Sequence, residues 1–263
     1  MNLINTITRA EAHDIRFILM DIDDTLTTKG KLSAGAYQAL WDLKRAGLKL
    51  IPITGRPGGW CDLIAREWPV DGVVGENGAF VFWEEHGVRK ELFHPSAVPN
   101  DHPILKHIRE QLSTYVPQVR IAKDQFARLF DYAFDFAEEE PKLPLSVAEQ
   151  VRDIALSCGA QAKISSIHVN VWLGQYDKRS TAELFLSEHF GWRAGIEDRA
   201  IFFVGDSPND EPLFERFPLT AAVATITQYH HYMHAYPRFI AGMEGGEGFA
   251  EIAAVLLNTR RNA

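Results

Sequence analysis

The stretch FILMDIDDTL, from Phe17 to Leu26, decides the fold of this 263-residue chain. Its first four residues are apolar, which is typical of a short strand buried on both faces. Three carboxylates follow at Asp21, Asp23 and Asp24. Side chains alternate along a strand, so the first two leave on the same side if the extended geometry continues. Close carboxylates repel each other, and a divalent cation such as Mg²⁺ would relieve that repulsion. An acidic loop that caps the next helix is the alternative interpretation.

Composition and charge limit the class of protein. The length suits one large or two modest domains, and 46% hydrophobic with 24% charged residues is ordinary for a globular chain. The net charge of −8 disfavours non-specific attraction to nucleic acid or to anionic membranes. We therefore expect neither nucleic acid nor membrane as a partner, whereas the oligomeric state cannot be predicted from the sequence.

Cysteine usage and the N-terminal sequence bear on the compartment. Cys61 and Cys158 lie far apart, without the spacing of a disulfide framework or a C-x-x-C pair. The first residues contain no apolar segment of the secretory type, and no apolar run approaches the ~18 to 20 residues that cross a bilayer. These features predict a soluble cytoplasmic protein.

Strands and helices alternate in two parts of the chain. In the first part we expect strands at 17–20, 48–53 and 73–74, with a helix between Ser33 and Gly47 and another over 59–68. From Asp177 the alternation resumes, with helices over 178–190, 209–216, 228–235 and 247–258, and strands over 200–204, 221–224 and 239–241. Such alternation predicts an α/β fold with a parallel sheet, in which ligands bind at the carboxyl ends of the strands.

A different pattern separates these two parts. Residues 79–83 and 89–93 are typical of a hairpin. We then expect a helix over 101–115, antiparallel strands within 119–137, a helix over 146–158, and strands over 161–165 and 167–173 with a short turn between them. This α-β-β-α-β-β order predicts an inserted α+β domain over 97–172, which divides a core made of 1–96 and 173–263.

Four polar clusters occupy strand ends and helix starts of the predicted sheet. Each is common by itself, but their order and positions together predict one composite site. The clusters are Asp21-Ile22-Asp23-Asp24-Thr25, Thr54-Gly55-Arg56, Lys178, and Gly205-Asp206-Ser207-Pro208-Asn209-Asp210.

These clusters resemble the four motifs of the haloacid dehalogenase (HAD) superfamily of aspartyl-phosphate phosphotransferases. The D-x-D-x-T motif matches at 21–25 and the G-D-x-x-x-D motif at 205–210. The insert is similar in position and element order to a type IIB cap, the subgroup of Cof-like, sucrose-phosphate and mannosyl-3-phosphoglycerate phosphatases. The resemblance implies a Rossmann-like parallel core with an inserted cap and a Mg²⁺-dependent phosphomonoester hydrolase acting on a small phosphorylated substrate, with a sugar phosphate expected.

The resemblance also implies a role for each residue that matches a motif. Asp21 is the expected nucleophile, and Asp23 the general acid that later serves as base. Mg²⁺ is expected on Asp21, Asp206 and the backbone carbonyl of Asp23. Lys178 would add positive charge beside the nucleophile and the phosphate. Asp210 would hold the metal through water or orient Lys178.

Further polar residues carry two interpretations each. Thr54 and the Gly55 amide are expected to hold phosphoryl oxygens. Arg56 either binds substrate or pairs with Glu76. Asn77 either faces the phosphate or serves only the turn that Asn-Gly favours. Asn209 lies either behind the metal ligands or at a helix cap. His168, Asn170 and Trp172 alternate along one strand of the insert and face either a sugar or solvent. His230 and His234 have the spacing of neighbours on a helix, and we expect them on a solvated face.

Three alternatives to a phosphatase follow from the same residues. A haloalkanoate dehalogenase is disfavoured because, as the resemblance implies, those enzymes lack a carboxylate at the position of Asp23. A phosphomutase would use the same nucleophile and pass the phosphoryl group to a sugar hydroxyl instead of water. A sensor that binds a phospho-ligand without turnover stays open too, although binding alone needs no general acid.

Overall fold

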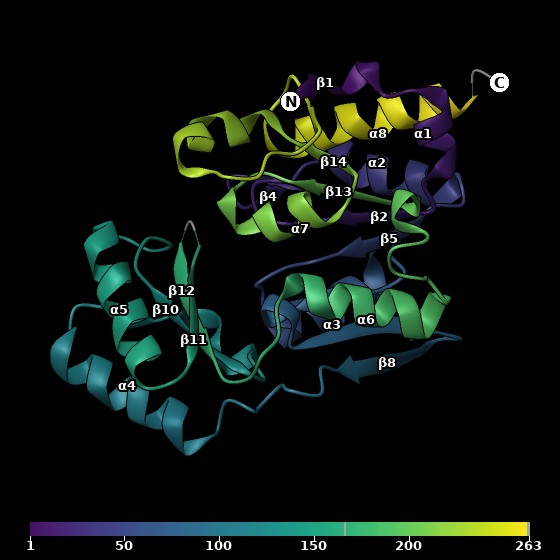
Figure 1. Cartoon of the computed structure of the whole chain (residues 1–263). Helices are drawn as coiled ribbons and strands as arrows, with labels where there is room; N and C mark the ends of the chain where they lie inside the picture. The colour runs from purple at the N-terminus through teal and green to yellow at the C-terminus, as the bar shows by residue number, and fades with distance from the viewer. Residues whose placement is uncertain (166, 262–263) are drawn as a thin grey trace.

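A six-stranded parallel sheet organises the larger body of the chain in the computed structural model, which describes residues 1–165 and 167–261 (Figure 1). All neighbouring pairs of its strands run parallel. The predicted α/β class is confirmed. In spatial order the strands are β1 (Asn2–Leu3), β15 (Phe239–Ile240), β14 (Leu219–Ala222), β13 (Ile201–Gly205), β2 (Phe17–Met20) and β5 (Lys49–Pro52).

The strand that precedes the first acidic motif is buried on both faces, as its unbroken apolar sequence predicts. Phe17 and Leu19 pack against α6 (Lys178–Phe190) and α7 (Glu211–Arg216). Ile18 and Met20 belong to the cluster formed with α2 (Ala34–Arg45) and α8 (Gly245–Arg261). Figure 1 shows these two pairs of helices on opposite sides of the sheet. Alternate side chains of β2 therefore belong to the apolar clusters on the two faces of the sheet.

The parallel sheet continues into a small antiparallel one. A bridge from Ile53 to Val74 connects the end of β5 to β6 (Val73–Gly75). The predicted hairpin is confirmed as β7 (Phe80–Glu85) and β8 (Val88–Phe93), which pair antiparallel beside β6. The helix α3 (Gly58–Glu67) contacts β6 and β7. The strand at 73–74 thus belongs mainly to this second sheet.

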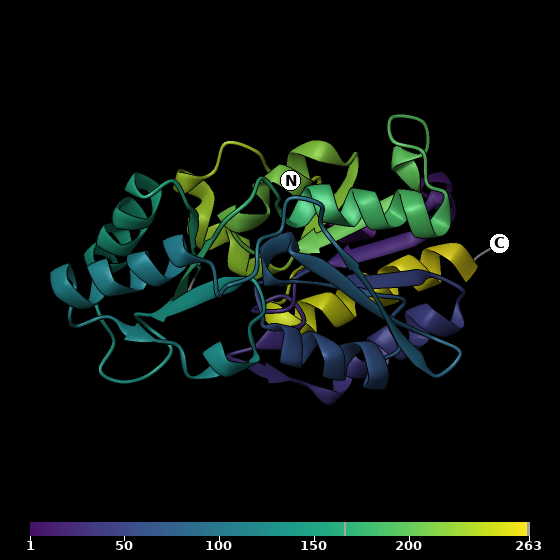
Figure 2. The same cartoon turned by 90° about the horizontal axis from the view of Figure 1, so that it is seen from below.

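The inserted segment forms its own antiparallel sheet and its own apolar cluster. The order of the strands is β11-β12-β10-β9, and α4 (Pro103–Tyr115) and α5 (Leu145–Ser157) pack on them. Figures 1 and 2 show this unit beside the carboxyl ends of the central strands. The boundaries at 97 and 172 stay a prediction, and residue 166, in the expected turn between the last two strands, lies outside the described residues. The strands are β9 (Arg120–Ile121), β10 (Asp131–Asp135), β11 (Gln161–Ile164) and β12 (His168–Trp172).

The antiparallel strands expected within 119–137 are confirmed as β9 and β10, and the expectation for a later helix was wrong. A 3₁₀ helix, η3 (Lys123–Ala127), lies between the two strands. The Gln125 side chain bonds the backbone of Asp131 and Ala133 there, in the place of a strand partner. The helix expected at 228–235 is instead a 3₁₀ helix, η6 (Ala224–Tyr232), in which only Ile226 is buried. Without an apolar face to bury, this segment lacks the packing that stabilises an α-helix.

The remaining short elements were not predicted. They contain too few residues for a pattern of period 2 or 3.6 to appear. They are α1 (Arg9–Asp14), the pair β3 (Thr27–Thr28) and β4 (Lys31–Leu32), and the 3₁₀ helices η1 (Ile4–Thr6), η2 (Glu76–Gly78), η4 (Asp198–Ala200) and η5 (Pro208–Asp210).

Candidate active site

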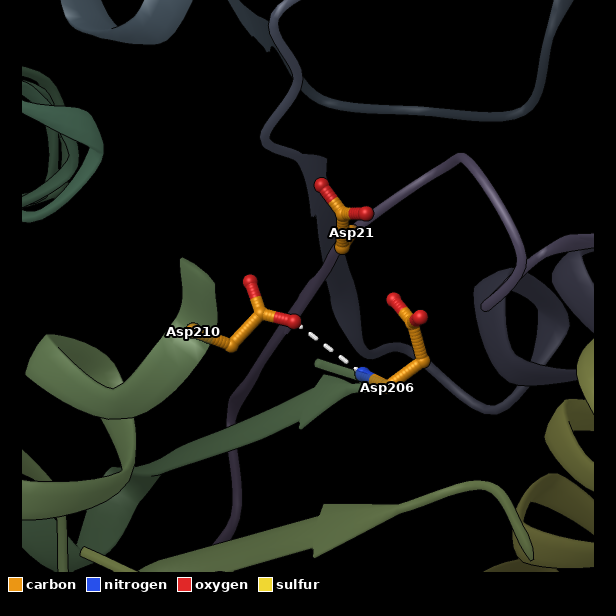
Figure 3. A group of neighbouring side chains, drawn as sticks. All are labelled: Asp21, Asp206 and Asp210. Atoms are coloured by element: carbon orange, nitrogen blue, oxygen red, sulfur yellow. Dashed lines mark hydrogen bonds between the residues drawn. The ribbon is translucent and has the colours of Figure 1, made fainter. Parts of the chain in front are cut away.

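Three aspartates converge at the carboxyl ends of two neighbouring strands. Asp21 directly follows β2 and Asp206 directly follows β13, and these strands pair in register at Met20 and Val204. Asp210 ends η5 and reaches the same place (Figure 3). One carboxylate oxygen of each aspartate lies within 4.8 Å of the other two. Parallel pairing therefore brings together residues about 185 positions apart, as the α/β architecture predicts.

The chemistry of this three-aspartate cluster fits a divalent cation. Asp210 accepts hydrogen bonds through Oδ2 from the amides of Asp206 and Ser207, whereas its buried Oδ1 has no hydrogen-bond partner among the described residues. Burial raises the pKa of Asp206 well above its usual range, and the charges of Asp210 and Asp21 add to the effect. Thr25 donates from Oγ1 to Asp206 Oδ1 over 3.0 Å and so orients that carboxylate. Closely packed oxygen ligands and unbalanced negative charge suit Mg²⁺.

A lysine at the start of α6 lies beside the three-aspartate cluster. Lys178 Nζ donates to Asp21 Oδ1 over 2.5 Å and lies 3.8 Å from Asp210 Oδ1. Burial acts to lower the pKa of Lys178, but the carboxylates of Asp21 and Asp210 outweigh it and raise that pKa. Burial also raises the pKa of Asp21, to about 7, against the opposing charge of Lys178. Lys178 therefore contacts the predicted nucleophile directly.

The loop after β5 and the turn η2 each bring one predicted residue to the cavity beside Asp21 and Lys178. Gly55 and Asn77 both line it, and a Cβ added at Gly55 would lie 3.2 Å from Asn77 Oδ1. Asn77 adopts a φ of +57°, and within residues 1–165 and 167–261 its buried Nδ2 has no hydrogen-bond partner. Thr54 is buried and does not line the cavity, and its Oγ1 accepts from the Arg56 amide over 3.0 Å. Asn77 thus offers an unused donor, whereas Thr54 shapes the loop.

Arg56 does not pair with Glu76, so that interpretation was wrong. Its guanidinium donates to Asp23 through Nε and Nη2, the latter over 2.8 Å, and to Glu138 over 3.4 Å. The face of the guanidinium lies 4.5 Å from the Trp60 ring centroid. Arg56 therefore connects the second aspartate of the motif to a residue of the insert.

The insert supplies one wall of the cavity. Of the three alternating residues predicted on β12, His168 and Asn170 line the cavity, whereas Trp172 is buried in the core cluster away from it. His168 Nε2 lies 2.8 Å from Glu138 Oε2, and this hydrogen bond, ahead of other causes, lowers the pKa of Glu138 to about 2. Asn170 Nδ2 donates to Asp131 Oδ2 over 2.7 Å.

Asn209 connects the core to the insert. Its Nδ2 donates to the Ile164 carbonyl over 3.3 Å, and its own carbonyl accepts from Lys163 Nζ over 2.8 Å. The interpretation of Asn209 as a helix cap was wrong, since the cap of η5 is Ser207, and Asp210 closes that capping box. Its position behind the metal ligands stays a prediction. His230 and His234 share no α-helix and bond Tyr236 and Glu211.

Sequence reasoning missed several residues of the cavity. Lys163 and Arg128, both from the insert, face the site, and burial lowers the pKa of Lys163 to about 8. No motif identifies them because each lies in a strand or loop whose register depends on the tertiary fold. The cavity measures about 260 Å³, near the low end for small-molecule sites.

Comparison with known proteins decides the family. The sequence profile of the haloacid dehalogenase-like hydrolases matches residues 18–156. The chain belongs to this family. No curated protein sequence matches the chain. The predicted membership of the HAD superfamily is confirmed, and the matched span includes the first motif, the Thr54-Gly55-Arg56 loop and most of the insert.

Solved structures show the same fold for the whole chain, core and cap together. Protein 0175 from Thermoplasma acidophilum is 21% identical, with a TM-score of 0.71 over 93% of this chain and 98% of that one. A HAD/COF-like hydrolase from Plasmodium vivax is 18% identical, with a TM-score of 0.69 over 97% and 99%. A sugar phosphatase of HAD subclass IIB is 15% identical, with a TM-score of 0.61 over 92% and 98%. The predicted Rossmann-like core with a type IIB cap is confirmed.

In the part of the chain that the structure describes, no helix combines sufficient length with sufficient apolar character to span a lipid bilayer.

Proposed function

We propose that this HAD-like hydrolase is a Mg²⁺-dependent phosphomonoester hydrolase that acts through an aspartyl-phosphate on a small phosphorylated metabolite, with a sugar phosphate expected. The observation that carries the proposal is the contact of Lys178 with Asp21 beside the three-aspartate cluster. A carboxylate that attacks an anionic phosphate ester needs positive charge beside it, which the Lys178 ammonium and the cation site can supply. The fold relative named a sugar phosphatase supports the substrate class.

Asp21 would begin the reaction by attacking phosphorus with one carboxylate oxygen. The bond from phosphorus to the leaving oxygen breaks, and that oxygen takes a proton from Asp23. Lys178 offsets the charge that gathers on Asp21 and the transferring group. Bound Mg²⁺, with Asp21, Asp206 and Asp210 as its nearby carboxylates, would supply further charge neutralisation.

Water then replaces the leaving group. Asp23 takes a proton from the water, whose oxygen attacks phosphorus, and the acyl-phosphate bond to Asp21 breaks to release inorganic phosphate. The ion pair with Arg56 suits this half of the reaction, because it fixes a carboxylate at the cavity. Asn77 Nδ2 is available to bind a phosphoryl oxygen.

The proposal is tested by phosphate release from a panel of phosphorylated metabolites, with Mg²⁺ and with EDTA. We expect metal-dependent release that falls by at least about 10³-fold in Asp21→Asn, while the exposed Asp101→Asn is unaffected. Mass spectrometry of quenched enzyme should find one phosphoryl group on Asp21. Full activity of Asp21→Asn would refute the proposal, and an isomerised product without free phosphate would favour the mutase.

A further inference from the structure

Four cationic side chains line the cavity, and one of them differs from the rest in its partners. Three make ion pairs with carboxylates, whereas in residues 1–165 and 167–261 Lys163 makes no ion pair with a carboxylate within 4.0 Å. The pairs are Arg56 with Asp23 and Glu138, Arg128 with Asp124 and Asp131, and Lys178 with Asp21 and Asp210.

Among the residues that the structure describes, the one hydrogen bond that Lys163 Nζ makes goes to a neutral carbonyl and not to a carboxylate. Lys163 lies on β11 opposite Asn170, and its half-buried side chain reaches the loop that carries Asp206 and Asp210. There Nζ donates to the neutral carbonyl of Asn209 over 2.8 Å. An ammonium has three donors, so the remaining capacity is available to a ligand. Burial opposes the charged form of Lys163, whereas the carboxylates of Asp210, Asp21 and Asp177 favour it from a distance. An anion bound directly to Nζ would offset the remaining cost of burial.

The position of Lys163 indicates which part of a substrate it would meet. In phosphoryl transfer the attacking and leaving oxygens lie roughly in line, on opposite sides of phosphorus. The attacking group, Asp21, comes from the core, and Lys178 already stands beside it. Lys163 comes from β11 of the cap and lines the same cavity, where its Nζ bonds the Asn209 carbonyl. A leaving group that points away from Asp21 enters the part of the cavity that the cap lines, within reach of a cap cation such as Lys163.

We propose that Lys163 determines specificity by binding an anionic substituent of the leaving group, either a carboxylate or a second phosphate. The inference rests on the hydrolase activity proposed above and narrows its substrates. Phosphorylated sugar acids, hydroxy acids and bisphosphates are preferred over phosphates of neutral sugars and alcohols. Among the other cap groups at the cavity, His168 and Asn170 are bonded within the cap. The charge of Arg128 is already paired with two carboxylates.

The test uses pairs of substrates that differ only in this charge. The carboxylate arm compares 3-phosphoglycerate with glycerol 3-phosphate, and the phosphate arm compares glucose 1,6-bisphosphate with glucose 6-phosphate. We expect kcat/KM to favour the anionic member of at least one pair by about tenfold or more. Lys163→Met should remove the preference through KM and leave the neutral member within about twofold, while Lys163→Arg should retain it.

A matched control is Lys106→Met, an exposed lysine on α4 of the cap, which should change neither member. Two results would contradict the role of Lys163 without affecting the proposed hydrolase activity. One is equal kcat/KM for both members of each pair, and the other is an equal loss of kcat/KM on both members in Lys163→Met at unchanged melting temperature. No hydrolysis of any member would instead refute the hydrolase. In that case, calorimetry would measure the affinity of wild type and of Lys163→Met for each member of the pairs. A weaker affinity of Lys163→Met for the anionic members alone would show that Lys163 binds the anion.

Discussion

A single guanidinium determines where the second aspartate of the motif can point. Arg56 holds Asp23 through two nitrogens, bonds Glu138 with a third and stacks over Trp60. A planar fork of donors can make all these contacts together, and an ammonium cannot. The side chain is nearly buried, so the pair with Asp23 is less screened than a surface ion pair. We infer that Arg56 is a positioning residue for Asp23.

This geometry predicts a specific kinetic effect of Arg56→Lys. The lysine keeps the charge but loses the two-point hold on Asp23, so kcat should fall by about 10- to 100-fold with KM nearly unchanged. Steady-state kinetics on the best substrate of the panel measures both constants. Arg66→Lys is the matched control, because Arg66 holds Asp62 in a similar pair on the exposed face of α3. A rise in KM at constant kcat would show instead that Arg56 binds substrate.

At the scale of elements, a turn of the core holds a turn of the cap. Glu76 lies buried in η2, between β6 and β7. Its carboxylate accepts hydrogen bonds from the amides of Leu129, Phe130 and Asp131, the shortest of them 2.7 Å to Phe130, and from the Gly58 amide at 2.9 Å. Burial raises the pKa of Glu76 to about 8, and the charge of Asp131 adds to the effect, whereas the amides of Leu129 and Phe130 act in the opposite direction. Glu76 thus fixes one point of contact between core and cap.

Glu76→Gln should weaken this contact, because one oxygen becomes an NH₂ group that faces backbone donors. Leaving buried amides without acceptors costs about 1 to 3 kcal/mol. We expect that loss in the free energy of unfolding in urea, together with faster hydrogen exchange at the amides of 129–131. The exposed Glu85→Gln in β7 is the control and should change neither. Unchanged exchange at 129–131 would contradict the anchoring role.

The elements also show how far the sequence could predict this structure. The core strands and α6 follow from unbroken apolar runs and helix-start residues, and α6 was predicted over its full length. The predicted residues Asp21, Lys178 and Asp206 come together because parallel strands end at one edge. Glu138 and Lys163 could not be found this way. Their partners lie 82 and 46 positions away, and only the docking of the cap brings them near.

At the scale of the whole molecule, folding without metal concentrates negative charge. Burial raises the pKa of Asp21 from 3.8 to about 7, and burial with the neighbouring charges raises that of Asp206 as well. Between pH 3.8 and about 7 the folded chain therefore binds more protons at Asp21 than the unfolded chain does. Stability falls with rising pH wherever the folded state holds the extra proton. The site then opposes folding at neutral pH unless a cation balances it.

The stability of the metal-free protein should accordingly fall from about pH 4 to about pH 7 through this site, and Mg²⁺ should restore it. At a free Mg²⁺ concentration 100 times Kd, binding adds about 2.7 kcal/mol, and each kcal/mol raises Tm by about 2 to 4 °C. Melting curves with EDTA and with Mg²⁺ at pH 5 and pH 7.5 measure both effects, and Mg²⁺ should stabilise more at pH 7.5, where protons no longer compete. Asp21→Asn removes one carboxylate, so it should raise Tm in EDTA at pH 7.5 and reduce the gain from Mg²⁺. Equal Mg²⁺ stabilisation of wild type and Asp21→Asn at both pH values would mean that the cation binds elsewhere, and the three-aspartate cluster would lose its assignment.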